Sequence, residues 1–323
     1  MLRRILRFLL GVLVTVISLA AIAAGLWTYF LYAPLPEPPP LSGTLQKGSI
    51  IAGGLTRTYA FYAPQGLAKG APLVVVMHGA GQSGEEIRFE TGYAFERLAD
   101  QQGFALVYPD GFEGWWNSCI TVDDSAANRN NIDDIAFLAA LEDKLVAEAG
   151  INPDKIFATG LSNGGDMAVR LALEDPSRYR GVAPVAANLP APENSKCATD
   201  SQGSTSVLLI HGTKDGLVPY QGGEGSLFGF YRSGPILSSL ETGRYFAKRA
   251  GIEAEPAVTD GTAIKRFLWG AGSAHEVELF AYVGAGHVFP QPYFRAPRLL
   301  GASPSEPDAA TVIWSFFVRQ TSH

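Results

Sequence analysis

A serine stands between two glycines at the boundary of a predicted strand and a predicted helix. The run 160–164, Gly-Leu-Ser-Asn-Gly, fits the pattern Gly-x-Ser-x-Gly, in which a sharp turn holds the Oγ of Ser162 out of the sheet. Glycines are needed there because side chains would collide with the neighbouring backbone, and the helix N-terminus behind the turn favours negative charge. In a chain with 36 glycines the pattern also arises by chance. Its meaning therefore depends on the groups that accompany it.

The first group required is an acid. A serine hydroxyl needs an imidazole to remove its proton, and a carboxylate to orient that imidazole. In α/β-hydrolases these groups follow the chain order Ser, Asp or Glu, His. Asp215 follows the apolar strand predicted at 207–210, and active sites of open α/β sheets lie at such strand ends. Asp215 is therefore the expected acid, with a turn-capping role as the alternative. Asp260 is a weaker candidate because no strong strand precedes it.

The second group is a base, for which the chain offers five histidines. His78 and His211 precede the acid, His275 begins a predicted strand, and His323 ends the chain. His287 instead follows the strand predicted at 276–282, in a loop flanked by glycine. A base must lie at such a strand end, so His287 is the expected base, with an ordinary loop histidine as the alternative.

An oxyanion hole completes the set. Backbone N–H groups must point at the carbonyl oxygen as it becomes an alkoxide. One donor is expected at Asn163, directly after the serine. The other is expected at Ala80, in the glycine-rich loop 78–84 that follows the strand predicted at 72–77. A plain glycine-rich turn is the alternative for this loop. Four elements in the required order are far less probable by chance than any one alone.

The segments that must position these groups alternate between strand and helix from about Ser49 onward. Strands are predicted at 57–62, 72–77, 104–108, 155–159, 207–210 and 276–283, with helices near 85–101, 135–145, 236–250 and 308–318. This alternation predicts a mostly parallel α/β sheet with helices on both faces, forming one catalytic domain at 49–323. Asp133 and Asp134 open one of these helices, where aspartates usually act as caps.

The N-terminus carries a candidate membrane segment. Three arginines precede the uncharged stretch 8–32, whose 25 residues would reach about 37 Å as a helix, against a hydrocarbon core of about 30 Å. We expect a membrane anchor at 1–33, with its N-terminus in the cytoplasm, and a stiff proline-rich linker at 34–48. A cleaved signal peptide is the alternative because 21–23, Ala-Ile-Ala, imitates a cleavage site. Both interpretations place the rest of the chain outside the cytoplasm, either tethered to the membrane or secreted.

Cysteine content and charge agree with an exported enzyme. Cys119 and Cys197 are the only cysteines and suit a single disulfide, with two unpaired thiols as the alternative. Charged residues make up 17% of the chain, the net charge is −6, and no basic stripe is present, so no nucleic-acid partner is expected. No cofactor and no obligatory protein partner is expected either.

With these residues in place, the chain resembles the polyhydroxybutyrate depolymerase family of esterases, which overlaps the feruloyl and acetylxylan esterases of carbohydrate esterase family one. The resemblance runs over about 57–290 and rests on the motifs 72–79, 81–83, 108–111, 116–117, 133–138, 160–164, 211–215, 218–220 and 286–290. It implies an α/β-hydrolase fold, no metal, and hydrolysis of carboxylic esters through an acyl-enzyme, with Ser162, Asp215 and His287 as the triad. Family members often have tryptophan where this chain has Phe289 and cysteine where it has Ala80, which leaves the specificity open.

The expected function is that of an exported serine esterase acting on polyester, feruloyl or acetyl-sugar esters. Trp115 and Trp116 lie in a loop, 111–131, that we expect to border the site, and with Phe289 they are candidate substrate contacts. Packing beneath the loop is an equal alternative for the tryptophans. Rival functions are a cell-envelope acyltransferase, a peptidase on the same fold or a binding protein without catalysis.

Overall fold

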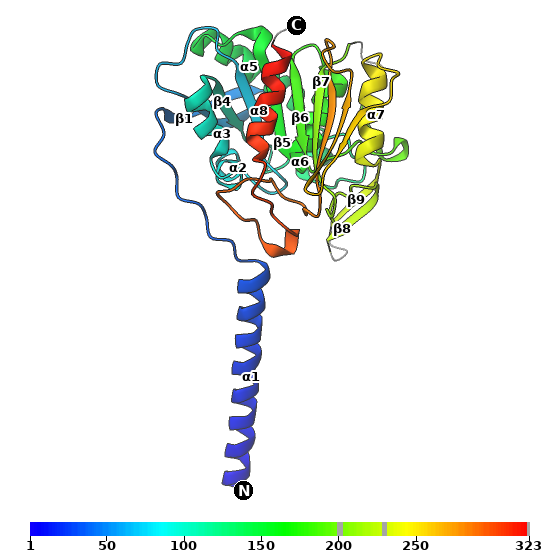
Figure 1. Cartoon of the computed structure of the whole chain (residues 1–323). Helices are drawn as coiled ribbons and strands as arrows, with labels where there is room; N and C mark the ends of the chain where they lie inside the picture. Colours follow the sequence, from blue (N-terminus) through cyan, green and yellow to red (C-terminus); the bar gives the residue numbers. More distant parts are fainter. Residues whose placement is uncertain (199–202, 228–230, 322–323) are drawn as a thin grey trace.

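The computed structural model describes residues 1–198, 203–227 and 231–321. Helix α1 (Leu2–Phe30) projects from a globular part that begins at strand β1 (Figure 1). The helices of the globular part are α2 (Gly84–Glu90), α3 (Ala94–Gln102), α4 (Ala126–Arg129), α5 (Asp134–Ala149), α6 (Asn163–Glu174), α7 (Ser239–Arg249) and α8 (Ala309–Gln320). The strands are β1 (Thr44–Ala52), β2 (Leu55–Ala63), β3 (Leu73–Met77), β4 (Ala105–Pro109), β5 (Ile156–Leu161), β6 (Gly181–Val185), β7 (Ser206–Gly212), β8 (Gly223–Leu227), β9 (Tyr231–Ile236), β10 (Ala257–Asp260), β11 (Ile264–Trp269) and β12 (Val277–Tyr282).

The main sheet follows the order β1-β2-β4-β3-β5-β6-β7-β12-β11-β10, and β8 and β9 form a separate hairpin. The central strands β4, β3, β5, β6, β7 and β12 run parallel. The edge pairs are antiparallel. Every residue of β3, β4, β5, β6 and β7 is buried, as continuous apolar runs covered on both faces require. The structure thus confirms the predicted mostly parallel α/β sheet.

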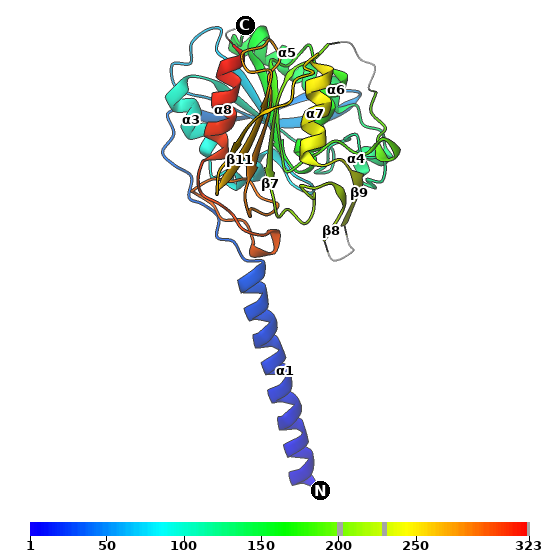
Figure 2. The same ribbon diagram turned by 45° about the vertical axis from the view of Figure 1, so that its right-hand side comes forward.

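Helices cover the sheet on both faces, as expected. One apolar cluster joins the sheet to α5, α6 and α7, and the other joins it to α2, α3 and α8. Figure 2 shows α3 and α8 on one side of the sheet and α7 on the other. Stacked aromatic pairs fix α8 to the sheet face: Phe157 lies on Phe317 with ring centroids 4.5 Å apart, and Phe104 lies on Trp314 at 3.9 Å. This packing holds the central strands and their carboxyl ends in place.

The structure differs from the sequence prediction in three places. Strand β1 begins at Thr44, within the segment 34–48 expected to be linker, because backbone pairing with β2 orders a mostly polar edge strand. The helix expected near 85–101 is two helices, because Gly92 and Tyr93 adopt φ 65° and 55° and break it. Strands β6, β8, β9, β10 and β11 were not predicted. Strand β6 is short and holds Gly and Pro, and β10 is fully exposed, so neither has a strong apolar pattern.

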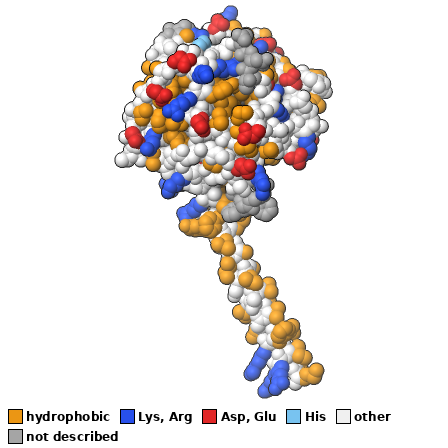
Figure 3. All heavy atoms as spheres, turned by 90° about the vertical axis from the view of Figure 1, so that its right-hand side faces the viewer, with side chains coloured by type: hydrophobic (Ala, Val, Ile, Leu, Met, Phe, Trp, Pro, Cys, Tyr) orange, Lys and Arg blue, Asp and Glu red, His pale blue; other side chains and the backbone are white. Residues whose placement is uncertain are grey.

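Helix α1 is long and apolar enough to cross a membrane. Its most apolar stretch has a mean hydropathy of 2.5, and none of its residues is buried against the rest of the chain. Figure 3 shows hydrophobic side chains along the helix and basic side chains at its free end. Helix α1 meets the globular part at the short helix η3 (Arg298–Leu300), where the guanidinium of Arg298 lies 4.3 Å from the ring centre of Tyr29.

Candidate active site

Ser162 lies at the sharp turn between β5 and α6. Its backbone adopts φ 55° and ψ −119°, a conformation that is rare outside glycine and that collects at functional sites. An added Cβ at Gly160 would lie 2.4 Å from the carbonyl oxygen of Gly164, and one at Gly164 would lie 2.4 Å from the carbonyl oxygen of Met77. Both flanking positions therefore require glycine, as the sequence predicts. The serine itself is partly exposed.

The three residues expected to form a triad lie at the carboxyl ends of parallel strands. Ser162 follows β5, Asp215 lies three residues after β7, and His287 lies in the loop after β12. In the sheet β6 separates β5 from β7, and β7 is paired with β12. The carboxyl ends of parallel strands meet at one edge of the sheet, so this topology gathers three residues spread over 126 positions of the chain.

Asp215 and His287 are in direct contact. Oδ2 of Asp215 lies 2.8 Å from Nδ1 of His287, and both residues are buried. Oδ1 of the same carboxylate accepts backbone N–H groups from Leu217 and Val218, each at 2.9 Å. An ionised carboxylate only accepts hydrogen bonds, so Nδ1 of His287 carries the proton and Nε2 is free to take another. This is the tautomer that a general base requires.

Electrostatics favour a basic imidazole at this position. Burial acts to lower the pKa of His287, but the charge of Asp215, its hydrogen bond and the nearby carboxylates of Glu90 and Asp166 raise that pKa overall. Burial likewise acts to raise the pKa of Asp215, but the charge and hydrogen bond of His287 lower it overall. Asp166 lies in the first turn of α6, and its N–H donates to the carbonyl oxygen of Ser162 at 2.8 Å.

The loop expected to supply an oxyanion donor is held from both sides. The N–H of Gly79 donates to Oε1 of Gln82 at 2.8 Å, and the N–H of Gly81 donates to the carbonyl oxygen of Gly114 at 2.9 Å. Between them Ala80 is exposed. Within the described residues neither the N–H of Ala80 nor that of Asn163 donates a hydrogen bond to the chain. Both remain available to a developing oxyanion.

Two of the remaining histidines have structural roles. His78 accepts the N–H of Gly111 at Nε2 at 2.8 Å, so its Nδ1 carries the proton and donates to the carbonyl oxygen of Gly79 at 2.7 Å. Nε2 of His211 lies 2.7 Å from the carbonyl oxygen of Val218. These bonds join loops around the site. His275 is partly buried beyond the other end of the sheet, and His323 lies outside the described residues.

Two of the three aromatic residues expected to contact substrate are enclosed, and Asp260 is not an acid of this site. Trp116 is fully buried, with its indole N–H donating to the carbonyl oxygen of His78 at 3.0 Å. Phe289 is buried, with its ring centre 5.8 Å from that of Phe95. Both side chains pack in the interior, and only Trp115 stays partly exposed. Asp260 lies on exposed strand β10 and pairs with a lysine.

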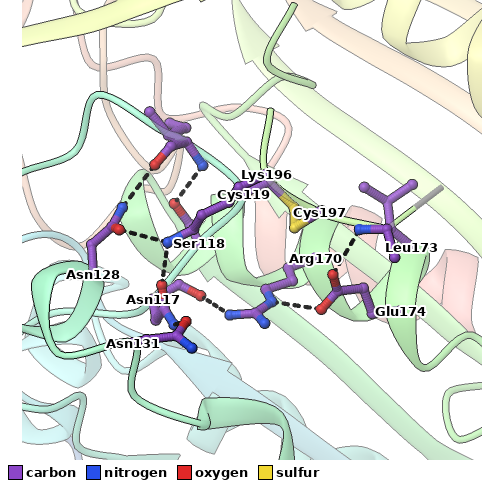
Figure 4. Close-up of a disulfide and its surroundings, with 12 residues drawn as sticks. Asn117, Ser118, Cys119, Asn128, Asn131, Arg170, Leu173, Glu174, Lys196 and Cys197 are labelled. Atoms are coloured by element: carbon purple, nitrogen blue, oxygen red, sulfur yellow. Dashed lines mark hydrogen bonds and ion pairs between the residues drawn. A yellow bond between two sulfur atoms is a disulfide. The ribbon is translucent and has the colours of Figure 1, made fainter. Parts of the chain in front are cut away.

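Cys119 and Cys197 form a disulfide, which confirms the expected pairing. Figure 4 shows that polar contacts extend this link. The ammonium of Lys196 lies 2.5 Å from Oδ1 of Asn117. Arg170 of α6 donates to the backbone oxygen of Asn117 at 2.6 Å and also pairs with Glu174. The disulfide and these bonds therefore fasten the loop 111–131, here called the tryptophan loop, to α6, the helix that follows Ser162.

Two acidic residues beside His287 were not predicted. Glu90, at the end of α2, accepts a hydrogen bond from Nε2 of Gln82 at 2.9 Å. Asp166 lies on α6 and is 6% exposed. Sequence reasoning treated both as ordinary helix residues. The place of Asp166 in the first turn of the helix after the Gly-x-Ser-x-Gly run was the one available signal.

These observations define a class of protein. A mostly parallel sheet with helices on both faces, a glycine-flanked serine on a strained strand-to-helix turn and a buried Asp–His pair at the neighbouring strand ends are the features of the α/β-hydrolase fold. A solved structure agrees with this fold. The acetyl xylan esterase from Aspergillus awamori superposes with a TM-score of 0.59 at 17% identity, covering 86% of this chain and 100% of that one.

Sequence comparison gives the family. A sequence model of the family "Esterase PHB depolymerase" matches residues 57–190. The protein named "Putative esterase NocK" of Nocardia uniformis subsp. tsuyamanensis is 30% identical over 304 residues, covering 89% of this chain and 86% of that protein. Feruloyl esterase C of Emericella nidulans is 27% identical over 271 residues, covering 81% and 84%. The chain belongs to the polyhydroxybutyrate depolymerase family of esterases and is a carboxylic ester hydrolase.

Proposed function

We propose that this protein is an exported, membrane-anchored serine esterase that works through Ser162, His287 and Asp215 and an acyl-enzyme. The observation that carries the proposal is the 2.8 Å contact between Nδ1 of His287 and Oδ2 of Asp215, at the strand ends next to a serine on a strained turn. It supports a base whose free nitrogen is ready to accept the proton of the serine.

The reaction follows from these positions. Nε2 of His287 removes the proton of Ser162 while Oγ attacks the ester carbonyl, and the N–H groups of Ala80 and Asn163 receive the oxyanion. When the tetrahedral intermediate collapses, the imidazolium protonates the leaving alcohol and an acyl-enzyme remains. His287 then removes a proton from water, the resulting hydroxide attacks the acyl carbon, and Ser162 is released with its proton restored.

The site belongs outside the cytoplasm in this proposal. The arginines in the first two turns of α1 favour a cytoplasmic N-terminus, and the disulfide suits an oxidising compartment. Helix α1 contacts η3, and η3 supplies the carbonyl oxygen of Leu300 that accepts the N–H of His287 at 2.7 Å. The His287 loop therefore lies at the membrane-side end of the domain, where Figure 1 also shows the β8–β9 hairpin.

The substrate class is proposed from the relatives. Feruloyl esterase C and the acetyl xylan esterase carry names that indicate feruloyl esters and acetyl esters of xylan. The poly(3-hydroxyalkanoate) depolymerase C of Paucimonas lemoignei, 25% identical over 247 residues, carries a name that indicates a polyester. We include all three ester classes in the proposal because Phe112 and Trp115, the partly exposed aromatic side chains of the loop 111–131, do not select one of them.

The test uses the detergent-solubilised full chain. Ser162→Ala is expected to abolish hydrolysis of short p-nitrophenyl esters and labelling by a fluorophosphonate, with an unchanged unfolding midpoint. Ser177→Ala is the matched control, because this exposed serine lies between α6 and β6 at the opposite end of the sheet, and it should keep full activity. Full ester hydrolysis by Ser162→Ala would refute the proposal. Faster acyl transfer to an added alcohol than to water would redefine the enzyme as an acyltransferase.

A further inference from the structure

Asp166 is a buried carboxyl group beside the catalytic residues that the mechanism does not use. It lies in the first turn of α6, and its N–H donates to the carbonyl oxygen of Ser162, the N-cap of that helix, at 2.8 Å. Only 6% of its surface is exposed. The charge of Asp166 also helps to raise the pKa of His287, in agreement with a position near the imidazole. Asp166 is therefore a buried acid in the first turn of the helix that follows the nucleophile.

Among the described residues this carboxyl group has no partner. No hydrogen bond or ion pair between described residues includes its oxygens, which keep a small contact with solvent, whereas most buried carboxyl groups are paired within the protein. Buried acids elsewhere in this structure follow that rule: Asp134 pairs with Arg57 at 2.8 Å, and Glu96 pairs with Arg88 at 2.7 Å. Asp166 differs from both because it lies at the site rather than in the core packing.

The charges around Asp166 indicate which kind of ligand it would pair with. Burial, followed by the negative charge of Asp123, raises the pKa of Asp166 to about 8, and the charge of His287 only partly opposes this. Glu90, whose charge also helps to raise the pKa of His287, has its own pKa raised by burial. Within the described residues, no lysine or arginine contributes to the pKa of Asp166. The surroundings are acidic and lack a countercharge, which a bound ligand would supply.

We propose that Asp166 is a specificity residue that binds a cationic group of the ester substrate, a protonated or quaternary amine in its acyl or alcohol part. The proposal rests on the proposed esterase function, since the amine must be attached to an ester that reaches Ser162. Because the carboxyl group is buried and otherwise unpaired, an ammonium group beside it gains a close ion pair in surroundings of low polarity. Anionic esters would be repelled by the carboxylates of Asp166, Asp123 and Glu90.

The experiment compares cationic esters with neutral esters of the same shape. On the acyl side, the p-nitrophenyl ester of 4-(trimethylammonio)butyrate is compared with that of 5,5-dimethylhexanoate. On the alcohol side, acetylcholine is compared with 3,3-dimethylbutyl acetate. The quantity measured is the ratio of kcat/KM for the cationic ester to that for its neutral isostere, with the full chain in detergent. Taking this ratio removes any general change in the activity of a variant.

Asp166→Asn keeps the shape of the side chain and removes its charge. We expect the ratio for one of the two pairs to fall by about tenfold or more, the scale of losing one partner of a buried charge pair. In the wild type the ratio should also rise from pH 6.5 to pH 9 as Asp166 loses its proton, and in Asp166→Asn it should stay flat. Asp154→Asn removes an exposed carboxylate at the other end of the sheet and controls for net charge.

Three outcomes would overturn the inference, and a fourth would refute the esterase proposal. Ratios that change less than threefold in Asp166→Asn would overturn the inference. An equal loss on cationic and neutral esters would overturn it too, because Asp166 would then act through His287. A fall in the ratio of the same size in Asp154→Asn would show a long-range charge effect and no binding site. Failure of the wild type to hydrolyse any of the four esters would refute the esterase proposal itself.

Discussion

The contact between Asp215 and His287 leads to a prediction about the substitution Asp215→Asn. The two backbone N–H groups of Leu217 and Val218 both point at Oδ1, each at 2.9 Å. An asparagine side chain must therefore turn its oxygen toward these donors and its NH₂ group toward Nδ1 of His287. Nδ1 then has to accept a hydrogen bond, which moves the ring proton to Nε2. In that tautomer His287 no longer accepts the proton of Ser162.

The expected loss follows from this change of tautomer. A substitution with the same effect in a Ser-His-Asp triad lowers kcat about 10⁴-fold, which corresponds to about 5 kcal/mol of transition-state stabilisation. The substitution also removes the negative charge that helps to raise the pKa of His287. The residual activity should consequently reach its plateau at lower pH than the wild-type activity does.

The assay is the pH dependence of kcat/KM on a short p-nitrophenyl ester, with urea unfolding of both proteins as the control for folding. Asp215→Asn should unfold at nearly the same urea concentration, because the amide oxygen still accepts both loop N–H groups. A loss of less than tenfold in kcat/KM would refute the assigned role. So would an unchanged pH profile, because the carboxylate would then not be acting on His287.

Two further predictions concern stability. Replacing Cys119 and Cys197 by serine opens a loop closed across 78 residues, so the free energy of unfolding should fall by about 2–5 kcal/mol in urea titrations; an unchanged value would show that the polar contacts alone fasten the tryptophan loop. Burial raises the pKa of Glu142 to about 8, against the opposing effects of Tyr179 and Arg178. The protonated form therefore favours the folded state, and this contribution is complete below the unfolded pKa of about 4.3 and is lost as the pH rises through about 8. Glu142→Gln should weaken the fall in stability between pH 5 and pH 8.5, and an identical fall in both proteins would contradict this reasoning.

Much of the fold could be predicted because the central strands are short apolar runs that end in glycine or polar residues. Such runs are typical of strands buried on both faces, and β3, β4, β5 and β7 have this pattern. The edge strands could not be predicted in this way. Strand β10 is fully exposed, and its pairing with β11 depends on backbone bonds that any sequence can make.

The candidate site likewise has features that the sequence predicts and features that only the structure shows. The glycine-flanked Ser162, and the place of Asp215 and His287 directly after predicted strands, depend on local chain geometry, which sequence patterns record. The roles of Trp116 and Phe289 depend on which direction each side chain takes from its loop. Only the packed structure determines that direction, and it places both in the interior.

The sequence by itself therefore determined the class of fold, the apolar N-terminal helix and the candidate nucleophile with its candidate partners in order, because each depends on residue types at short spacing. The tertiary structure alone decided which carboxylate oxygen meets His287, which N–H groups stay free beside Ser162, and that Asp166 is buried there without a partner. These are contacts between segments far apart in the chain. They exist only after the sheet has brought the ends of β5, β7 and β12 together.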